Sequence, residues 1–574
     1  MGRSPQQTLP PEHSTTEFCR QHLSSTSIYT LLHRDGHRLF PDEMFADLFS
    51  GIGRNSEPPR WVATVLVLQR LEGLSDREAV DRLLFDLRWK YACGGLGFDE
   101  AGFAHTVLVE MRERLRKSDK PNRIFDVAVQ VAKDAGLVGR KRVLDSTALY
   151  DAVATQDTVT LIRSAIRSLL KVADEDLEKE LRSSLKRDDD YRTPGKPVCD
   201  WEDEKARGQL VDALAQDALA LLLKLEGRAC SLKVKEAAQL LATVVGQDLE
   251  QTPEGTFRIA RRVAPDRVIS IVDPEARHGH KTAARGFDGY KGHISVDPDS
   301  ELIMAVEVTP GNAADGSVAK ELLQEVLPSP SEVPPAGSNL STVEQRDPFG
   351  PEQGEGPIPR GPSESSSIVL NTFPLPSEQS EQEPPKAPVE VYGDSSYGTA
   401  DLVEHVEQAG AEAHLKVQSP SAPPGKFSKE KFDIDEEAGT VKCPQGKLAQ
   451  IRRQKDGSGF ASFGEPCKDC PLKEQCTESN EGRTIRIHPR EGTLSRYRRR
   501  QKQKDWKRKY RSTRPKVERK IADLTRRRHG GRRMRVRGRE RVKQDFTLGA
   551  AAVNLKRLAK LGVCHSGTKW VVGQ

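Results

Sequence analysis

Helical spacing of apolar residues dominates the chain between residues 41 and 120. One stripe there is formed by Val65, Leu68, Leu71 and Leu74. Ser75 is followed three residues later by Glu78, which predicts a capping box that opens another helix. Residues 1–40 are polar and show no such pattern. We therefore expect an irregular, disordered N-terminus and a compact helical domain over 41–120.

Strand-like runs begin after the helical domain. The first, at 141–150, is followed by a long charged helical stretch over 155–250. Three runs rich in β-branched residues then predict strands: 267–273, 289–297 and 302–311. A helix is predicted over 315–327. These segments predict the first part of an α/β core at 138–327, interrupted by a helical insert at 155–250.

The composition changes abruptly after residue 327. Residues 328–390 hold 14 of the 36 prolines of the chain, together with many Ser, Glu and Gly. This composition predicts a disordered insert over 328–388. Beyond it, a strand, a helix and another strand predict a second part of the core at 389–431. Without its inserts, the core is expected to be a mixed sheet with helices on its faces.

Basic residues are concentrated near the C-terminus. The formal net charge is +6, but residues 491–543 alone contain 24 Lys and Arg against 5 Asp and Glu. Such a patch suits a polyphosphate partner, because each neutralised phosphate releases counterions. Aromatic residues interleave with the charges: Tyr497, Trp506 and Tyr510. A solvated basic helix is the alternative. We expect a basic C-terminal part at 481–562, followed by a tail at 563–574.

No part of the sequence indicates a membrane or secreted protein. There is no run of about 18 apolar residues, and the first residues lack the apolar stretch of a signal peptide. The nine cysteines are an odd number, so a secreted disulfide framework is not expected. The sequence therefore predicts a cytoplasmic protein.

Three carboxylates form a candidate metal site. Asp145 and Asp394 lie on or directly after apolar strand-like runs, where a buried carboxylate needs a cation. Glu518 lies at the edge of a buried helical stripe: Val517, Ile521 and Leu524. Three such groups can hold two Mg²⁺ (or Mn²⁺) ions and support in-line phosphodiester cleavage and strand transfer. The chain has 84 acidic residues, and any one of them is more often a turn or cap residue.

Four cysteines form a second constellation within residues 432–480: Cys443, Cys467, Cys470 and Cys476. Thiolates select zinc over magnesium, and four of them would leave no open coordination position. The pattern predicts a small insert like a zinc knuckle, with structural Zn²⁺. Free buried thiols are the alternative.

The surrounding motifs give the carboxylates a context. They include LDSTAL (144–149), VTPGNAADG (308–316), YGDSSYG (392–398), RPKVERKIADL (514–524) and the GYK element at 289–291. With these motifs in this order, the chain resembles the DDE transposases of bacterial insertion sequences. The resemblance implies an RNase H-like core with a five-stranded mixed sheet. It also implies that Asp145, Asp394 and Glu518 are the catalytic acids.

The signature around the third acid is only partly present. Many relatives carry Tyr-x2-Arg-x3-Glu-x6-Lys, and Arg514 and Glu518 fit it. Arg511 stands at the Tyr position, with Tyr510 one residue early. Thr525 stands at the Lys position and is followed by Arg526.

Several residues are expected to contact DNA or its phosphates: Tyr290, Lys291, Tyr510, Arg514 and Arg526. Arg514 can hold a phosphate bidentately. Three histidines, His278, His280 and His293, are expected to face DNA or to be structural rather than to bind Mg²⁺, which prefers oxygen ligands.

The resemblance implies a nucleoid-associated protein that acts on double-stranded DNA, namely terminal inverted repeats and target DNA. Because transposition holds two DNA ends together, we expect a homodimer or a higher oligomer on DNA. Two alternatives stay open. One is an inactive or repurposed derivative that only binds DNA, and the other is a different two-metal nuclease such as a resolvase.

Overall fold

The structure is a computed structural model of the 574-residue chain. It describes residues 14–49, 56–151, 155–282, 285–327, 387–526 and 530–573. The proline-rich insert expected at 328–388 lies outside these residues up to position 386. The described helices include none that is both long and apolar enough to cross a membrane.

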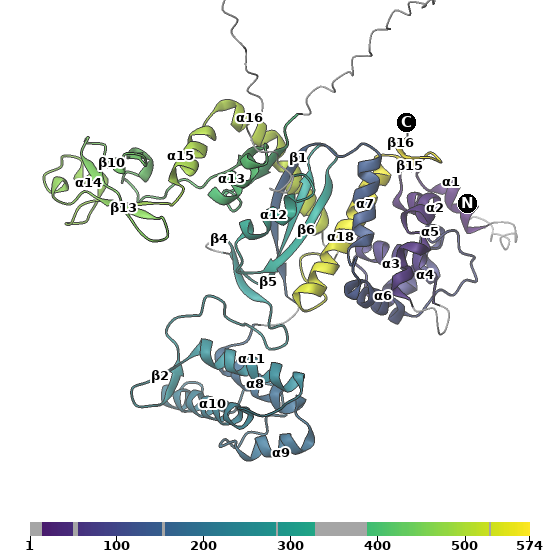
Figure 1. Ribbon diagram of the computed structural model, residues 1–574. Coiled ribbons are helices and arrows are strands. Elements are labelled where there is room, and N and C mark those ends of the chain that lie inside the picture. Colours follow the sequence, from purple (N-terminus) through teal and green to yellow (C-terminus); the bar gives the residue numbers. More distant parts are fainter. Residues whose placement is uncertain are drawn as a thin grey trace, which may run out of the picture.

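A mixed sheet occupies the centre of the molecule (Figure 1). Its strands are β1 (Lys141–Tyr150), β4 (Arg277–Thr282), β5 (Arg285–Asp297), β6 (Leu302–Pro310), β7 (Glu390–Gly393) and β8 (Glu412–Leu415). The order is β4-β5-β1-β7-β8, with β6 also paired to β5. β1 runs antiparallel to β5 and parallel to β7. The sheet therefore has the mixed character expected from the sequence.

The expected number of five strands was wrong by one, because the central sheet has six. β4 pairs with the first residues of β5, and β6 pairs with the rest of the same strand. The run at 267–273, which was expected to be a strand, is irregular. Its apolar members Val268 and Ile269 are buried. Burial in a packed loop produced the same apolar signal as a strand would.

The two faces of the sheet are covered by different helices. Residues of β1 alternate between the faces, since Val143 belongs to one hydrophobic core and Leu144 to another. The core around Leu144 includes residues of α12 (Ala319–Leu323) and α13 (Ala400–Gln408). The core around Val143 includes residues of α7 (Arg123–Asp134), α17 (Pro515–Leu524) and α18 (Arg539–Lys560). The sheet is thus a three-layered core with a distinct helix set on each face.

The N-terminal helices pack against α18 rather than directly covering the sheet (Figure 1). They are α1 (Thr15–His22), α2 (Ile28–Leu39), α3 (Pro59–Glu72), α4 (Asp76–Phe85), α5 (Leu87–Ala92) and α6 (His105–Lys117), with a 3-10 turn at Asp42–Leu48. The capping box of Ser75 and Glu78 is present at the start of α4. The expectation of an irregular stretch over 1–40 was wrong for residues 15–39. Ser14 and Ser27 cap α1 and α2, and α2 buries apolar residues at helical spacing.

The helical insert forms a separate lobe with its own core (Figure 1). Its helices are α8 (Thr158–Val172), α9 (Glu175–Ser183), α10 (Glu204–Leu225) and α11 (Leu232–Asp248), followed by a hairpin of β2 (Leu249–Gln251) and β3 (Phe257–Ile259). The amphipathic pattern at 155–250 is thereby confirmed. The insert leaves the sheet after β1 and returns to it at β4.

The cysteine-bearing segment forms a second projection, beyond α15 (Figure 1). It contains two small sheets, β9 (Asp433–Asp435) with β10 (Thr440–Lys442) and β11 (Leu448–Gln450), and β12 (Arg452–Arg453) with β13 (Gly459–Ser462) and β14 (Thr484–Ile487). Its short helical elements are Lys429–Lys431, Glu465–Cys467 and α14 (Lys473–Cys476).

Three helices lead from this projection back to the sheet: α15 (Glu491–Arg500), α16 (Lys504–Thr513) and α17. Beyond α18, the expected tail at 563–574 contains a small hairpin of β15 (Val563–His565) and β16 (Trp570–Val572). Val563 is buried and belongs to the core shared by the N-terminal helices and the sheet. The C-terminal residues up to 572 are therefore part of the fold.

Candidate active site

Asp145 lies in the middle of β1, on the face of the sheet that α17 covers. β1 contacts α17 directly. The Asp145 side chain is 13% exposed, and the backbone N–H of Ser146 donates to its Oδ1 at 2.8 Å. A carboxylate this far from water is stable in its charged form only next to cations or hydrogen-bond donors.

Asp394 lies directly after β7, the parallel neighbour of β1. Neighbouring parallel strands present their carboxyl ends at the same edge of a sheet. The Asp394 side chain is 39% exposed, and the backbone N–H of Ser396 donates to its Oδ1. The turn therefore fixes one oxygen of this carboxylate and leaves the other free to bind a cation.

Pro515 fixes the start of the helix that carries Glu518, the third predicted acid. α16 ends at Thr513 and α17 begins at Pro515, so Arg514 lies at the junction of the two helices. Proline favours the first position of a helix because it lacks the N–H that would be unsatisfied there. Val517, Ile521 and Leu524 are buried against the sheet, as the helical stripe predicted. Glu518 lies one turn after Arg514, at the exposed edge of α17.

The guanidinium of Arg514 contacts all three predicted acids. Its Nη2 lies 2.9 Å from Asp145 Oδ1 and 3.7 Å from Asp394 Oδ2. Its Nη1 lies 3.6 Å from Glu518 Oε1. The Arg514 side chain is only 9% exposed, and its Nη1 has no hydrogen-bond partner. The fold thus gathers Asp145, Asp394 and Glu518 around one buried cation that keeps a spare donor.

The donor set fits divalent metal ions of the Mg²⁺ type. All three groups are carboxylates, which are the ligands that Mg²⁺ prefers, and they already surround a positive charge. In the described part of the chain, however, no three His, Cys, Asp or Glu side chains are close enough together to hold one ion. The carboxylates are gathered around Arg514 instead. The expectation that Asp145, Asp394 and Glu518 hold the metal ions therefore stays a prediction.

Burial raises the pKa of Asp145 to about 6, although the Arg514 guanidinium lowers it. The ordinary value is 3.8. In the metal-free protein, Asp145 therefore binds more protons in the folded state than in the unfolded chain between about pH 4 and 6. Asp145 accordingly contributes a loss of stability as the pH rises through this window.

We expect divalent-metal binding to weaken below about pH 6. The metal needs the ionised carboxylate, so affinity should fall about tenfold for each pH unit below the pKa of Asp145. Mn²⁺ titrations by calorimetry between pH 5 and 8 measure this. The Asp145→Asn variant has no carboxyl group at this position, so its metal affinity should not show this pH dependence. The same pH dependence in the variant as in the unaltered protein would contradict the role of Asp145.

The structure does not place Tyr290 where it could contact DNA. Its side chain is fully buried, and its hydroxyl donates to Asp273 Oδ1 at 2.6 Å. The expected phosphate contact was therefore wrong, because Tyr290 points into the core on the face covered by α18. Alternation along β5 then puts Lys291 on the opposite face.

Lys291 is engaged by Asp315, a residue that sequence reasoning did not single out. Lys291 Nζ lies 2.8 Å from both Asp315 Oδ1 and the carbonyl oxygen of Ala313. Ser146 Oγ, next to Asp145, donates to the other oxygen of Asp315 at 2.6 Å. Asp315 lies in the VTPGNAADG motif, so the signal was present, but only the register of β1, β5 and β6 shows its partners. Because Lys291 is paired with Asp315, it is less available to bind a phosphate.

The expected DNA contacts on the basic helices fall into two groups. Tyr510 is half-buried, stacks on Trp506 with ring centroids 4.8 Å apart, and donates to the carbonyl of Gly393. Trp506 and Tyr497 are buried, so these aromatic residues fix the helices against the core. Arg526 is exposed and pairs with Asp523 at 3.2 Å. Exposed cations on α16 accompany them: Lys504, Lys507, Arg508 and Lys509.

The three histidines have different environments. His293 is fully buried between Tyr397 and Thr309, so it is structural. His278 pairs with Asp288 at 2.7 Å and lies edge-on against His280. Both line a cleft of ≈ 650 Å³ beside the β4–β5 hairpin, together with Arg267 and Arg277. Arg267 and Arg277 are paired with Asp248 and Asp266, so the expectation that His278 and His280 face DNA stays a prediction.

Three family models match separate parts of the chain. A model described as a transposase domain matches residues 32–114, in the N-terminal helices. Two models described as transposase DDE domains match residues 251–336 and 442–559. The chain belongs to the DDE transposases of insertion-sequence type. The resemblance drawn from the motifs is thereby confirmed, and with it a function in transposition and a mixed α/β core of this family's kind.

The matched ranges contain only some of the candidate active-site residues. Residues 442–559 include Arg514 and Glu518, whereas Asp145 and Asp394 lie outside all matched ranges. No curated protein and no solved structure matches this transposase. The roles of its individual acids therefore depend on the contacts around Arg514.

Proposed function

We propose that this transposase cleaves DNA at the ends of its own element and joins those ends to target DNA. The observation that carries the proposal is the contact of one buried guanidinium with Asp145, Asp394 and Glu518. Three carboxylates around a positive centre, beside a strongly basic helical segment, suit phosphodiester chemistry on a polyanion.

Each residue has a distinct role in this proposal. Asp145 and Asp394 are held by the strands and their turns, so they define the metal site. Glu518 is 64% exposed and completes the site from α17. When bound, the divalent ions neutralise charge on the scissile phosphate and lower the pKa of the attacking water or 3′-hydroxyl.

Arg514 is proposed to bind the phosphate adjacent to the cut. Its Nη1 has no hydrogen-bond partner and its side chain is nearly buried, so a phosphate that binds there supplies the missing hydrogen bonds. The exposed lysines and arginines of α16 extend the same surface along the DNA backbone. Both DNA ends must be held during joining, so we propose at least a dimer on DNA.

A cleavage and joining assay tests the proposal directly. The full chain is incubated with Mg²⁺, a DNA fragment that ends in the element's terminal inverted repeat, and a target plasmid. Expected products are ends with a free 3′-hydroxyl and fragments joined to the plasmid, and chelation of Mg²⁺ should abolish both.

Two outcomes would contradict the proposal. Binding without any cleavage would identify a derivative that only binds DNA. Cleavage without joining would identify a nuclease of a different kind, such as a resolvase. A scrambled terminal repeat of the same length is the matched control for sequence-specific cleavage.

A further inference from the structure

Residues 427–488, here called the cysteine module, have too small a core for their length. Eight of their residues form the buried cluster: Phe432, Val441, Ala449, Ala461, Phe463, Cys476, Ile485 and Ile487. The module projects away from the central sheet (Figure 1), so it gains little from the large cores. Small segments with so few buried residues often gain stability from disulfides or a bound metal.

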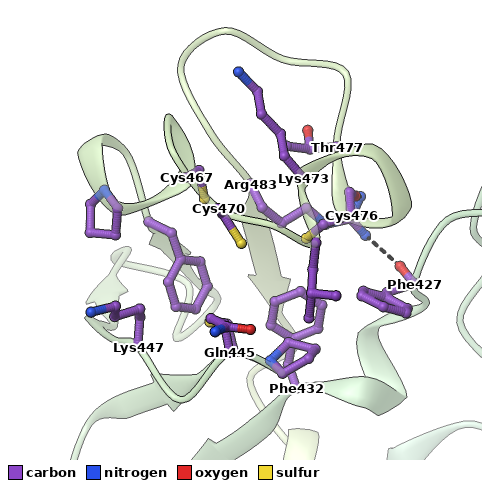
Figure 2. Close-up of a pocket in the computed structure, with 15 residues that line it drawn as sticks. Phe427, Phe432, Gln445, Lys447, Cys467, Cys470, Lys473, Cys476, Thr477 and Arg483 are labelled. Carbon is purple, nitrogen blue, oxygen red and sulfur yellow. Dashed lines mark hydrogen bonds between the residues drawn. The ribbon is translucent and has the colours of Figure 1, made fainter.

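All four clustered cysteines line one small hollow in this module. Cys443, Cys467, Cys470 and Cys476 surround a cavity of ≈ 20 Å³. Figure 2 shows Cys467, Cys470 and Cys476 around this space, with their side chains coming from a turn, a loop and a short helix. A cavity of this size accommodates about one water-sized particle. The other five cysteines of the chain lie outside the module.

Local backbone turns bring the four cysteines to the hollow. Cys443 follows β10 and opens a tight turn, in which its N–H donates to the carbonyl of Lys447 and Gly446 adopts a φ of 82°. Cys467 ends a 3-10 turn after Gly464, whose φ is also positive. Cys470 accepts at its carbonyl from the N–H of Lys473, which starts the helix that ends at Cys476. The two positive-φ positions favour glycine, so these turns are specific to the sequence.

The remaining walls of the hollow favour an ion held by sulfur. They are largely apolar, with Phe427, Phe432, Phe463 and Leu472 among them, so the only soft ligands facing the space are the thiols. Arg483 and Lys473 also line it, and the Arg483 Nε is buried without a hydrogen-bond partner. A centre of four thiolates around a divalent ion carries two negative charges, and these cations offset them.

We propose that Cys443, Cys467, Cys470 and Cys476 bind one structural Zn²⁺ ion. Four S–H bonds break, the protons leave to solvent, and four Zn–S bonds form without any change of oxidation state. The described residues contain no ready-made group of three metal-binding side chains. The sulfurs must therefore move inward onto the ion as it binds. Four protein ligands leave no open position, so the ion is not catalytic.

A zinc ion in the cysteine module would stabilise the position of the helices that carry the candidate active-site residues. Glu491, at the start of α15, is 1% exposed and pairs with Lys429 of the module at 2.5 Å and with Arg498 of α15 at 2.7 Å. Lys502, just beyond α15, pairs with Glu430 at 2.7 Å. A rigid module therefore anchors the start of the segment that continues into α16 and α17.

Metal analysis of the full chain tests the proposal without any assay of transposition. Protein purified under reducing conditions should contain about one zinc per chain by elemental mass spectrometry. Cys470→Ser should lower the zinc content at least tenfold. Cys564→Ser, which removes a cysteine in β15, is the matched control and should keep it.

Two further measurements use the unaltered protein, so their results do not depend on whether a variant folds. Replacement of the native metal by Co²⁺ should give a thiolate-to-cobalt charge-transfer band. Chelation of the unaltered protein should make trypsin cut within residues 427–488 at least ~tenfold faster, while cleavage of the N-terminal helices is unchanged. Four free thiols with no bound metal, bound iron in place of zinc, or disulfides between these cysteines would each overturn the proposal.

Discussion

Asp145→Asn is expected to reduce DNA cleavage by at least ~10³-fold while the protein stays folded. The substitution keeps the shape of the side chain but removes the charge that a metal ion requires, and metal-assisted charge stabilisation supplies several kcal/mol of the barrier reduction. The amide still accepts from the N–H of Ser146, which holds this position in β1. Cleavage rates on the terminal repeat, measured at saturating Mg²⁺, give the effect.

Asp299→Asn is a matched control for this variant. Asp299 follows the neighbouring strand β5 and pairs with Lys141 and Lys516 at 3.3 Å, but it does not contact Arg514. Its cleavage rate should stay within about twofold of the unaltered protein, because exposed ion pairs contribute little. Cleavage by Asp145→Asn at the rate of this control would remove Asp145 from the catalytic site.

Arg514→Met is expected to destabilise the protein in metal-free buffer, and Mg²⁺ is expected to reverse much of that loss. The substitution keeps the length of the side chain and leaves Asp145 and Asp394 without their shared cation. Breaking a fully buried pair costs about 3–5 kcal/mol. The cost here should be smaller, about 2–3 kcal/mol, because Asp394 is 39% exposed. Denaturant unfolding at pH 8, with and without Mg²⁺, measures the free energy.

The same variant should also cleave about 10–100-fold more slowly at saturating Mg²⁺, because a charged hydrogen bond to the phosphate is lost. Arg508→Met, on the exposed side of α16, is the matched control for the loss of one positive charge; Arg508 is 79% exposed. Equal destabilisation of the two variants, or no response of Arg514→Met to Mg²⁺, would show that Arg514 is not the counter-ion of the acids.

Local patterns predicted the elements that hold the site. The apolar run of β1 and the strand before Asp394 are short-range signals, and the stripe of Val517, Ile521 and Leu524 fixed the buried side of α17. The convergence of Arg514 on all three acids was not predictable in detail. It depends on the parallel register of β1 and β7 and on the junction at Pro515, which connects two helices with different directions.

The errors arose where the partner of a segment is distant in the sequence. Tyr290 and Lys291 were both expected to contact DNA, although adjacent residues of a strand face opposite sides of a sheet. The sequence also did not show that α18, some 250 residues later, belongs to the core that encloses Tyr290. In the run at 267–273, Val268 and Ile269 are apolar because they are packed, not because they form a strand. Asp315 was overlooked for the same reason, since its partners Ser146 and Lys291 come from other strands.

The position of α18 has a consequence for how the protein matures on the ribosome. This helix is translated after the N-terminal helices and all six strands of the sheet, yet it contacts α3, α7 and β6 and joins their cores into one. All of its residues from Phe546 to Leu555 are buried. Until α18 emerges from the ribosome, the apolar surfaces of the N-terminal helices and of the sheet that it will cover remain exposed to solvent. A nascent chain therefore acquires its complete core, and with it a rigid base for the proposed catalytic acids, only after α18 has emerged.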